Sequence, residues 1–212
     1  MSEQSGLSNL AHEPDPDAVQ DRYDQWVSTY EDDVRSWGYE VPEALAARLA
    51  RHLAPAMERP ILDAGCGTGL VGRALRSHPQ LAKRRIIGID ASPQSLAALP
   101  AGLYAETREV DLGGDLPFSP ASFDAVVCGG VLTYLPDTLS VLSNFGAAIA
   151  ADGVVIATQR TDLWASRSCG DVMSTLRNHG WRVDVSEPQP YLPGHPEYAD
   201  DIQVIYVTMT AA

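Results

Sequence analysis

The sequence predicts an α/β protein built around a doubly wound, mostly parallel β-sheet. After Pro60, short apolar runs alternate with helical patterns along the chain. A glycine-rich turn stands where the first of these apolar runs gives way to a helix. Of the 212 residues, 45% are hydrophobic and 20% are charged, which is enough apolar material for a full core. Strands separated by helices imply a parallel sheet that is covered on both faces.

The chain is expected to divide into a short tail and one domain. Residues 1–17 are polar and contain two prolines, which predicts a flexible N-terminal tail. Residues 18–212 have the length of a single domain. Within that domain, residues 18–55 are expected to form a helical cap before the alternating pattern begins.

Two helices are predicted in the cap. Residues 18–37 place Tyr23, Trp26 and Tyr30 on one helical face. Residues 41–53 carry a leucine at every fourth position and a proline in the first turn, which favours a second helix. The aromatic face of the first helix is expected to pack against another surface of the protein or over a bound ligand.

The alternating part of the chain predicts seven strands. The expected strands are 61–64, 85–90, 104–110, 123–128, 153–158, 181–187 and 201–210, and the expected helices are 69–77, 92–99, 137–151 and 169–179. Ser92 suits the N-cap of its helix, because Pro93 follows at the first helical position. The last two strands are joined by a proline-rich loop without a helix, which is compatible with an antiparallel hairpin at the sheet edge.

The charge balance argues against polyanionic partners. The chain has 28 acidic and 15 basic residues, a formal net charge of -13, whereas binders of nucleic acid concentrate lysine and arginine. No apolar run reaches the length of a membrane span, and the first residues do not resemble a signal peptide. The three cysteines suit a reducing compartment and lack metal-site spacing. We therefore expect a cytoplasmic protein without a metal, whose partner is a small molecule rather than nucleic acid or membrane.

The strongest motif is ILDAGCGTG at residues 61–69, where a strand becomes a helix. Glycine allows a tight turn and a close approach of the backbone to a ligand, beside the N–H groups of a helix start. The spacing differs from the dinucleotide-binding G-x-G-x-x-G because position 70 is leucine. Asp63 precedes the glycines, and its carboxylate suits an ammonium group and would repel a diphosphate. Cys66 lies inside the turn as either a nucleophile or, more commonly, a small buried hydrophobe.

Two further acidic residues follow the next two strands. Asp90 closes the second strand, where a carboxylate can accept hydrogen bonds from both hydroxyls of a ribose. The alternative is that Asp90 caps the helix that begins near Ser92. Asp111 and Leu112 end the third strand, and a carboxylate followed by a free backbone N–H can hold an adenine.

The fourth strand leads into FDAVVCGGVLTYL, residues 123–135. Gly129 and Gly130 end the apolar strand, and residues 129–131 would lie beside the reacting groups of a bound ligand. Thr133 and Tyr134 carry hydroxyls near the same strand end. The segment is also a buried strand followed by a helix start, and both interpretations hold together.

These four segments together resemble the class I S-adenosylmethionine (SAM)-dependent methyltransferases. The resemblance covers about residues 20–210 and implies a Rossmann-like sheet with the order 3-2-1-4-5-7-6 and an antiparallel seventh strand. It implies SAM as the cofactor, held at its methionine part by the glycine turn, at its ribose by Asp90 and at its adenine by Asp111 and Leu112. The cofactor-binding residues that follow are Asp63, Ala64, Gly65, Cys66, Gly67, Asp90, Ala91, Asp111, Leu112, Gly129, Tyr23, Trp26 and Tyr30.

The N-terminal stretch has a narrower resemblance. RYDQWVSTYEDDVRSWGY and LDAGCGTGLVG look like the corresponding segments of the Williams–Beuren-region methyltransferase-like proteins and their bacterial relatives. In that group the N-terminal helix lies over the cofactor, so Tyr23, Trp26 and Tyr30 would form a lid. The sequence departs from the group at Ala64, which replaces a bulkier residue, and at 78–85, a somewhat long connection.

The leading hypothesis is methyl transfer from SAM to a small, uncharged or cationic acceptor. The acceptor would lie between the N-terminal helix and residues 129–134, 163–169 and 191–195. Tyr134 and His195 are the candidate catalytic residues, should the acceptor have to lose a proton. The alternatives are a SAM-binding protein of the same fold that is cyclase-like or regulatory, a protein methyltransferase, and an NAD-dependent dehydrogenase, against which the glycine spacing argues.

Overall fold

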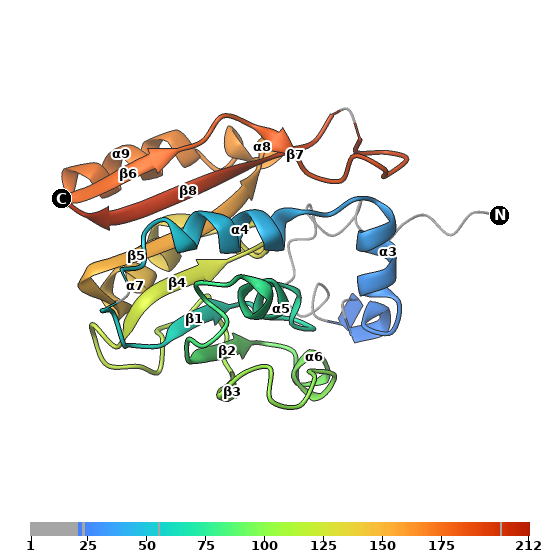
Figure 1. Ribbon diagram of the computed structural model, residues 1–212. Helices are drawn as coiled ribbons and strands as arrows, with labels where there is room; N and C mark the ends of the chain where they lie inside the picture. The colour runs from blue at the N-terminus through green and yellow to red at the C-terminus, as the bar shows by residue number, and fades with distance from the viewer. Residues whose placement is uncertain (1–20, 23, 55, 200) are drawn as a thin grey trace.

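The computed structural model describes residues 21–22, 24–54, 56–199 and 201–212. Its strands are β1 (Ile61–Ala64), β2 (Ile86–Asp90), β3 (Glu106–Glu109), β4 (Phe123–Cys128), β5 (Ile149–Arg160), β6 (Trp181–Val185), β7 (Gln189–Pro190) and β8 (Gln203–Ala211). Its helices are α3 (Tyr30–Ser36), α4 (Val41–Ala50), α5 (Leu70–Ser77), α6 (Pro93–Ala97), α7 (Thr138–Ala148), α8 (Thr161–Trp164) and α9 (Cys169–Asn178), with a 3₁₀ turn, η1, at Leu132–Tyr134. Figure 1 shows helices on both sides of one twisted sheet.

The sheet confirms the predicted doubly wound topology. Its order is β3-β2-β1-β4-β5-β8-β6, and β8 runs antiparallel to both of its neighbours. This is the expected order, with β8 as the predicted seventh strand. The prediction of seven strands misses β7, a two-residue strand in the proline-rich loop that pairs with the start of β8. A pairing of two residues is too short to produce a periodic pattern in the sequence.

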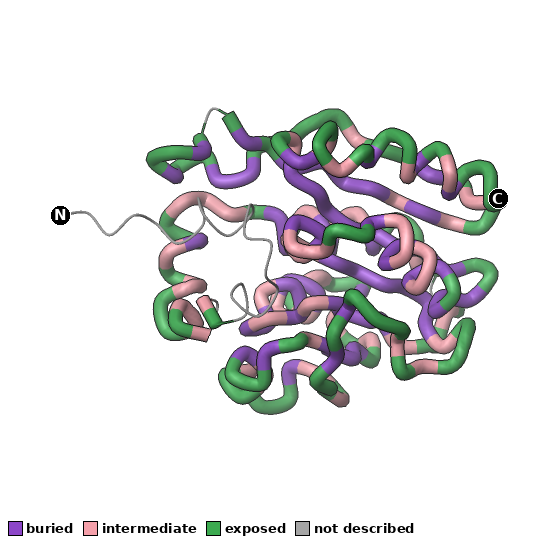
Figure 2. The backbone as a smooth tube through the Cα atoms, turned by 180° about the vertical axis from the view of Figure 1, so that it is seen from behind, coloured by how far each residue is buried: buried purple, intermediate pink, exposed green. Residues whose placement is uncertain are grey.

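Alternation along the strands supplies a core to each face. Ile61 packs into a cluster with the apolar residues of α4 and α5. Its neighbour Leu62 points to the opposite face and packs with α7 and α9. Figure 2 shows the buried residues along the central strands and the exposed ones on the outer turns and helices. The strands are thus buried on both faces, as parallel sheets require.

The N-terminal segment corrects one expectation. The predicted helix 18–37 is interrupted, because residues 27–29 form a turn between helical residues 24–26 and α3. The Thr29 N–H donates to the Trp26 carbonyl at 3.0 Å and closes this turn. The β-branched Val27 and Thr29 flank a serine here, and all three have lower helix propensity than alanine or leucine. The predicted tail and Tyr23 lie outside the described residues.

Most other boundaries agree with the sequence pattern. The first and fourth strands have the predicted bounds, and Ser92 caps α6 by accepting from the Ser95 N–H at 2.9 Å. β5 begins at Ile149, earlier than expected, because α7 ends there and the register with β4 shifts between Phe123 and Ala125. Among the helices of the described part, none has the length and apolar character needed to cross a membrane.

Candidate functional site

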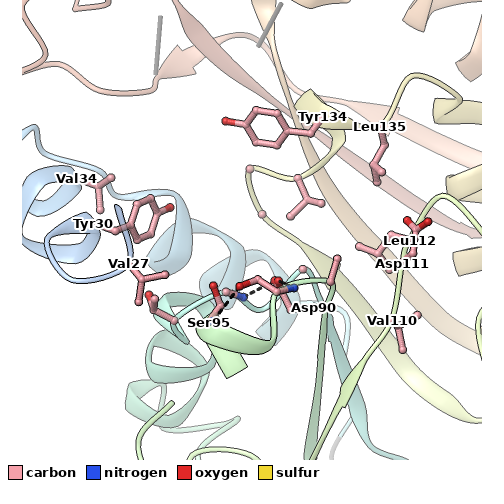
Figure 3. Close-up of a pocket in the computed structure, with 18 of the residues that line it drawn as sticks. Val27, Tyr30, Val34, Asp90, Ser95, Val110, Asp111, Leu112, Tyr134 and Leu135 are labelled. Carbon is pink, nitrogen blue, oxygen red and sulfur yellow. Dashed lines mark hydrogen bonds between the residues drawn. The ribbon is translucent and has the colours of Figure 1, made fainter. Parts of the chain in front are cut away.

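A cavity of about 460 Å³ opens at the carboxyl ends of the central strands. This is where ligands bind in open α/β sheets, and the volume lies in the usual range for small-molecule sites. Figure 3 shows the wall built by Val27, Tyr30 and Val34 on one side and by Val110, Asp111 and Leu112 on the other. The remaining lining residues are Tyr39, Gly65, Gly67, Thr68, Asp90, Ala91, Ser92, Ser95, Glu109, Gly129, Gly130, Val131, Tyr134, Leu135, Tyr191 and Leu192.

The glycine turn forms the floor of this cavity. Gly65 has a φ of +75°, and a Cβ atom there would lie 2.2 Å from Cγ2 of Val131. Gly67 has a φ of +49° but faces open space. Gly65 is therefore needed for both its conformation and its lack of a side chain, whereas Gly67 is needed mainly for its conformation.

Asp90 joins two segments of the cavity wall. One carboxylate oxygen, Oδ2, accepts the Gly67 N–H at 2.8 Å, and Oδ1 accepts the Ser92 N–H at 2.9 Å. Burial raises the pKa of Asp90, although the hydrogen bonds from Ser92 and Gly67 oppose that shift. Each carboxylate oxygen has more than one acceptor site. Asp90 can therefore support its own loop and still accept hydrogen bonds from a ligand.

Asp63 is fully buried beneath the turn and does not line the cavity directly. Its Oδ2 accepts the Tyr104 hydroxyl at 2.7 Å, whereas Oδ1 has no hydrogen-bond partner among the described residues. Burial raises the pKa of Asp63 to about 7, against the lowering effect of the Tyr104 hydrogen bond. An unsatisfied buried acceptor fits a ligand that brings an ammonium group to the turn.

Of the other predicted cofactor contacts, some line the cavity and some do not. Asp111 and Leu112 line the cavity, and Asp111 Oδ1 accepts the Gly113 N–H at 2.8 Å. Ala64 and Cys66 are buried and do not line it. Burial also raises the pKa of the Cys66 thiol, which favours the interpretation of a small hydrophobe over that of a nucleophile.

Four tyrosines contribute to the wall of the cavity. Tyr30, Tyr39, Tyr134 and Tyr191 all line it. Figure 3 shows the Tyr30 and Tyr134 hydroxyls pointing toward one another across the space. The Tyr39 ring meets the Tyr191 ring edge-on, with centroids 5.6 Å apart. Burial raises the pKa of Tyr30, Tyr39 and Tyr191, so these phenols stay neutral.

Tyr134 is held by an arginine that the sequence did not single out. Arg167 donates to the backbone carbonyls of Leu132, Thr133 and Leu135 at 3.0, 2.6 and 2.7 Å. These bonds fix the η1 turn and therefore the position from which Tyr134 enters the cavity. Tyr39 was also missed, although it ends the aromatic N-terminal stretch.

Three aromatic residues within the segments predicted to form the site do not line the cavity. His195 is 1% exposed, and its ring packs against Trp37 and Tyr198 with centroids 4.6 and 4.4 Å away. Its Nδ1 accepts the Glu197 N–H at 3.1 Å, so the imidazole is built into the loop. Trp26 donates to Asp33 at 2.6 Å, and Trp164 packs with the α7 and α9 cluster. His195 therefore packs within its loop and is not among the residues that line the cavity.

Known proteins resemble the chain in the region of the motifs and in the fold. A family profile described as a methyltransferase domain matches residues 62–155. Human (Homo sapiens) methyltransferase-like protein 27 is 37% identical over 114 residues, covering 52% of this chain and 45% of that protein. The ubiquinone biosynthesis O-methyltransferase of Paracidovorax citrulli is 35% identical over 109 residues, covering 49% of this chain and 44% of that protein. The chain thus spans less than half the length of these two curated relatives.

The fold likeness extends over nearly the whole chain. A structure described as the DhpI–SAH complex superposes with a TM-score of 0.64 at 21% identity, covering 93% of this chain and 97% of that one. The glycine turn, the strand order and these likenesses agree, and the chain has the Rossmann-like fold of the class I SAM-dependent methyltransferases, with a methyltransferase-domain match over residues 62–155.

Proposed function

We propose that this protein transfers a methyl group from SAM to a small-molecule acceptor. The observation that carries the proposal is a single cavity that runs from Asp90 and Asp111 at one end to Tyr134 and Tyr191 at the other. A cofactor at the acidic end would present its reactive part toward the tyrosines. The wall is more apolar than polar and has a few polar groups, which suits a small organic molecule.

The residues at the acidic end fit the cofactor in three places. Asp90 would accept the ribose hydroxyls, and Asp111 with Leu112 would hold the adenine. The unsatisfied Oδ1 of Asp63 would favour the ammonium of the methionine part, beside the backbone of the glycine turn. When bound, SAM supplies a methyl group already activated by its sulfonium.

The residues of this chain then have two tasks, which are to position the acceptor and to exclude water from the reacting groups. Val27, Tyr30 and Val34 cover the cavity from the N-terminal side and would shield the reacting groups. Val131, whose side chain abuts Gly65, and the Tyr134 ring would fix the approach of the acceptor. Tyr134 is the proposed proton acceptor only if the substrate must lose a proton.

Isotope transfer tests this function directly. Protein would be incubated with methyl-labelled SAM and, separately, with the small-molecule, protein and RNA fractions of a cell extract. Label should appear in the small-molecule fraction, and Asp90→Ala should reduce both transfer and the affinity for S-adenosylhomocysteine (SAH). Losing two hydrogen bonds of about 1 kcal/mol each predicts at least a tenfold weaker affinity.

The fractions also separate the alternatives. Label in the protein fraction alone would indicate a protein methyltransferase. Binding of SAH with label in no fraction would indicate a SAM-binding protein that does not transfer methyl groups. Stabilisation against heating by NAD but not by SAH would contradict the assignment of the cofactor.

Tyr134→Phe measures how far catalysis depends on a base. If positioning dominates, turnover should fall by much less than about a thousandfold while SAH affinity is kept. A larger loss at unchanged SAH affinity would show that the Tyr134 hydroxyl is an essential proton acceptor.

A further inference from the structure

The charged side chains that line the cavity all carry the same sign. Asp90, Glu109 and Asp111 line it, whereas no lysine, arginine or histidine among the described residues does so. The positions outside the described ranges hold no lysine or arginine at all. A carboxylate or phosphate on the acceptor would therefore find no lysine or arginine to pair with in this cavity. A cation would meet carboxylates and uncharged groups in the described wall.

Two of the tyrosine rings in the cavity wall meet at a right angle. Tyr39 follows α3 in the chain, and Tyr191 follows β7. Their ring centroids lie 5.6 Å apart, and the angle between the ring planes is 89°. The face of an aromatic ring is electrically negative and attracts an ammonium group that lies within about 6 Å of the centroid. At this angle one cation can lie against the faces of both rings, as in the aromatic cages that bind ammonium ligands.

Backbone hydrogen bonds hold this tyrosine pair in place. The Tyr39 N–H donates to the Val34 carbonyl at 3.1 Å, near the end of α3, and the Gly194 N–H donates to the Trp37 carbonyl at 2.9 Å. The second bond ties the loop that carries Tyr191 to the segment that carries Tyr39. Because the two backbones are connected in this way, little ordering of the rings is required when a ligand binds.

The polar atoms beside the Tyr39 ring suit a hydrogen-bond donor better than an anion. The Tyr39 hydroxyl lies close over Gly130, since a Cβ atom on that glycine would be 3.1 Å from the hydroxyl oxygen. The Gly130 N–H already donates to the Thr158 hydroxyl at 2.8 Å, so it is not available to an anion. A phenol oxygen can accept hydrogen bonds, and an ammonium group has donors alone. The position therefore combines ring faces with a hydrogen-bond acceptor for a cation.

We propose that the acceptor bound in this cavity is a small organic cation, whose ammonium group lies against the rings of Tyr39 and Tyr191. This inference rests on the proposed function, because it places the acceptor rather than the cofactor beside these rings. It narrows the uncharged or cationic acceptors expected from the sequence to the cationic ones. The two tyrosines are then specificity-determining residues, which recognise the charge of the acceptor.

Probes of one shape and different charge test the proposal without knowledge of the natural acceptor. Choline, its uncharged carbon isostere dimethylbutanol and the anion dimethylbutanoate would be titrated into SAH-saturated protein, with binding followed by saturation-transfer NMR. Choline and dimethylbutanol differ only in the replacement of the cationic nitrogen by a carbon. We expect choline to bind about tenfold more tightly than dimethylbutanol, as cations do on desolvated aromatic rings. Dimethylbutanoate should bind most weakly.

Substitutions then separate the aromatic ring from its hydroxyl. Tyr39→Leu and Tyr191→Leu each remove one ring and should weaken choline binding by about three- to tenfold, with little change for dimethylbutanol. Tyr191→Phe keeps the ring and should keep most of the choline affinity. Tyr206→Leu is the matched control, because it removes a buried tyrosine ring that does not line the cavity, and it should leave choline binding unchanged.

Several results would overturn the inference. These are dimethylbutanol or dimethylbutanoate binding as tightly as choline, no binding of choline by the wild type, competition between choline and SAH, or unchanged choline affinity in both leucine variants. The comparison of probes on the wild type decides even if a leucine variant does not fold, which loss of SAH binding would reveal. Each of these results leaves the proposed function standing if the wild type binds SAH. A wild type that fails to bind SAH would instead contradict the proposed function itself.

Discussion

At the scale of single residues, Asp63 couples the site to pH. Its pKa is raised to about 7 in the folded protein by burial, above the ordinary value near 4. Because the folded pKa is the higher one, the ionised carboxylate destabilises the fold. Stability from this group is full below about pH 4 and declines as the pH rises toward 7.

This raised pKa predicts that ligand binding releases protons. An ammonium group placed beside Asp63 would favour ionisation and lower its pKa. Titration calorimetry of SAH at pH 6 to 7, in buffers with different heats of ionisation, should show net proton release. Asp63→Asn keeps an acceptor for the Tyr104 hydroxyl and should abolish the release. Equal proton release in the variant would assign the effect to another group.

His195 is expected to matter for stability rather than for chemistry. Its ring fills the space between Trp37 and Tyr198. His195→Ala should lower the free energy of unfolding by about 2–4 kcal/mol, because it leaves a cavity and removes two aromatic contacts. Denaturant titration measures this loss, and the exposed His179→Ala serves as its control. Full stability of His195→Ala with loss of turnover would restore the catalytic hypothesis.

At the scale of elements, the segment from Asp24 to α3 is the part expected to respond to the cofactor. It is tied to the body by the Ser92 hydroxyl on Asp24 and by the Arg73–Glu31 ion pair. Both anchors are partly exposed and weak on their own. The turn at residues 27–29 also gives the segment a place to bend.

Hydrogen exchange measures this response. Amides in residues 24–37 should exchange more slowly when SAH is bound, because Tyr30 and Val34 would then pack on a ligand. Amides of α9, on the other face, should not change. Identical exchange in residues 24–37 with and without SAH would leave that segment a packing role alone.

The elements could be predicted wherever one local pattern fixes them. β1 and β4 are short, fully buried runs between turn signals, and their bounds follow from composition. The break at residues 27–29 was missed, because the spacing of Trp26 and Tyr30 fits a continuous helix equally well. β7 depends on its pairing with β8, which no local pattern encodes.

The same distinction applies to the site. Gly65, Asp90 and Asp111 belong to strand-end motifs, which the sequence makes visible. The role of Arg167 and the burial of His195 both depend on contacts between segments that are far apart in the chain. The sequence offers the loop histidine His195 as a catalytic candidate, and its burial becomes visible only once Trp37 packs against it.

At the scale of the whole molecule, the net charge of -13 predicts weak binding to polyanions. Fluorescence anisotropy with an RNA oligonucleotide at physiological salt should show no binding at micromolar protein. A protein of similar size with a basic surface provides the positive control. Submicromolar binding with a strong salt dependence would show a local basic surface and return RNA to the list of acceptors.

The insertion of β8 between β5 and β6 governs the order in which the sheet can close during synthesis. The ribosome delivers β5 and β6 first, and in the described sheet they touch only through β8. A released chain that ends before residue 203 therefore leaves one edge of the apolar strand β5 unpaired and β6 without a partner strand. Such edges pair readily with other chains. Premature termination in this stretch should thus yield a chain that aggregates or is bound by chaperones, whereas a chain that includes β8 should not.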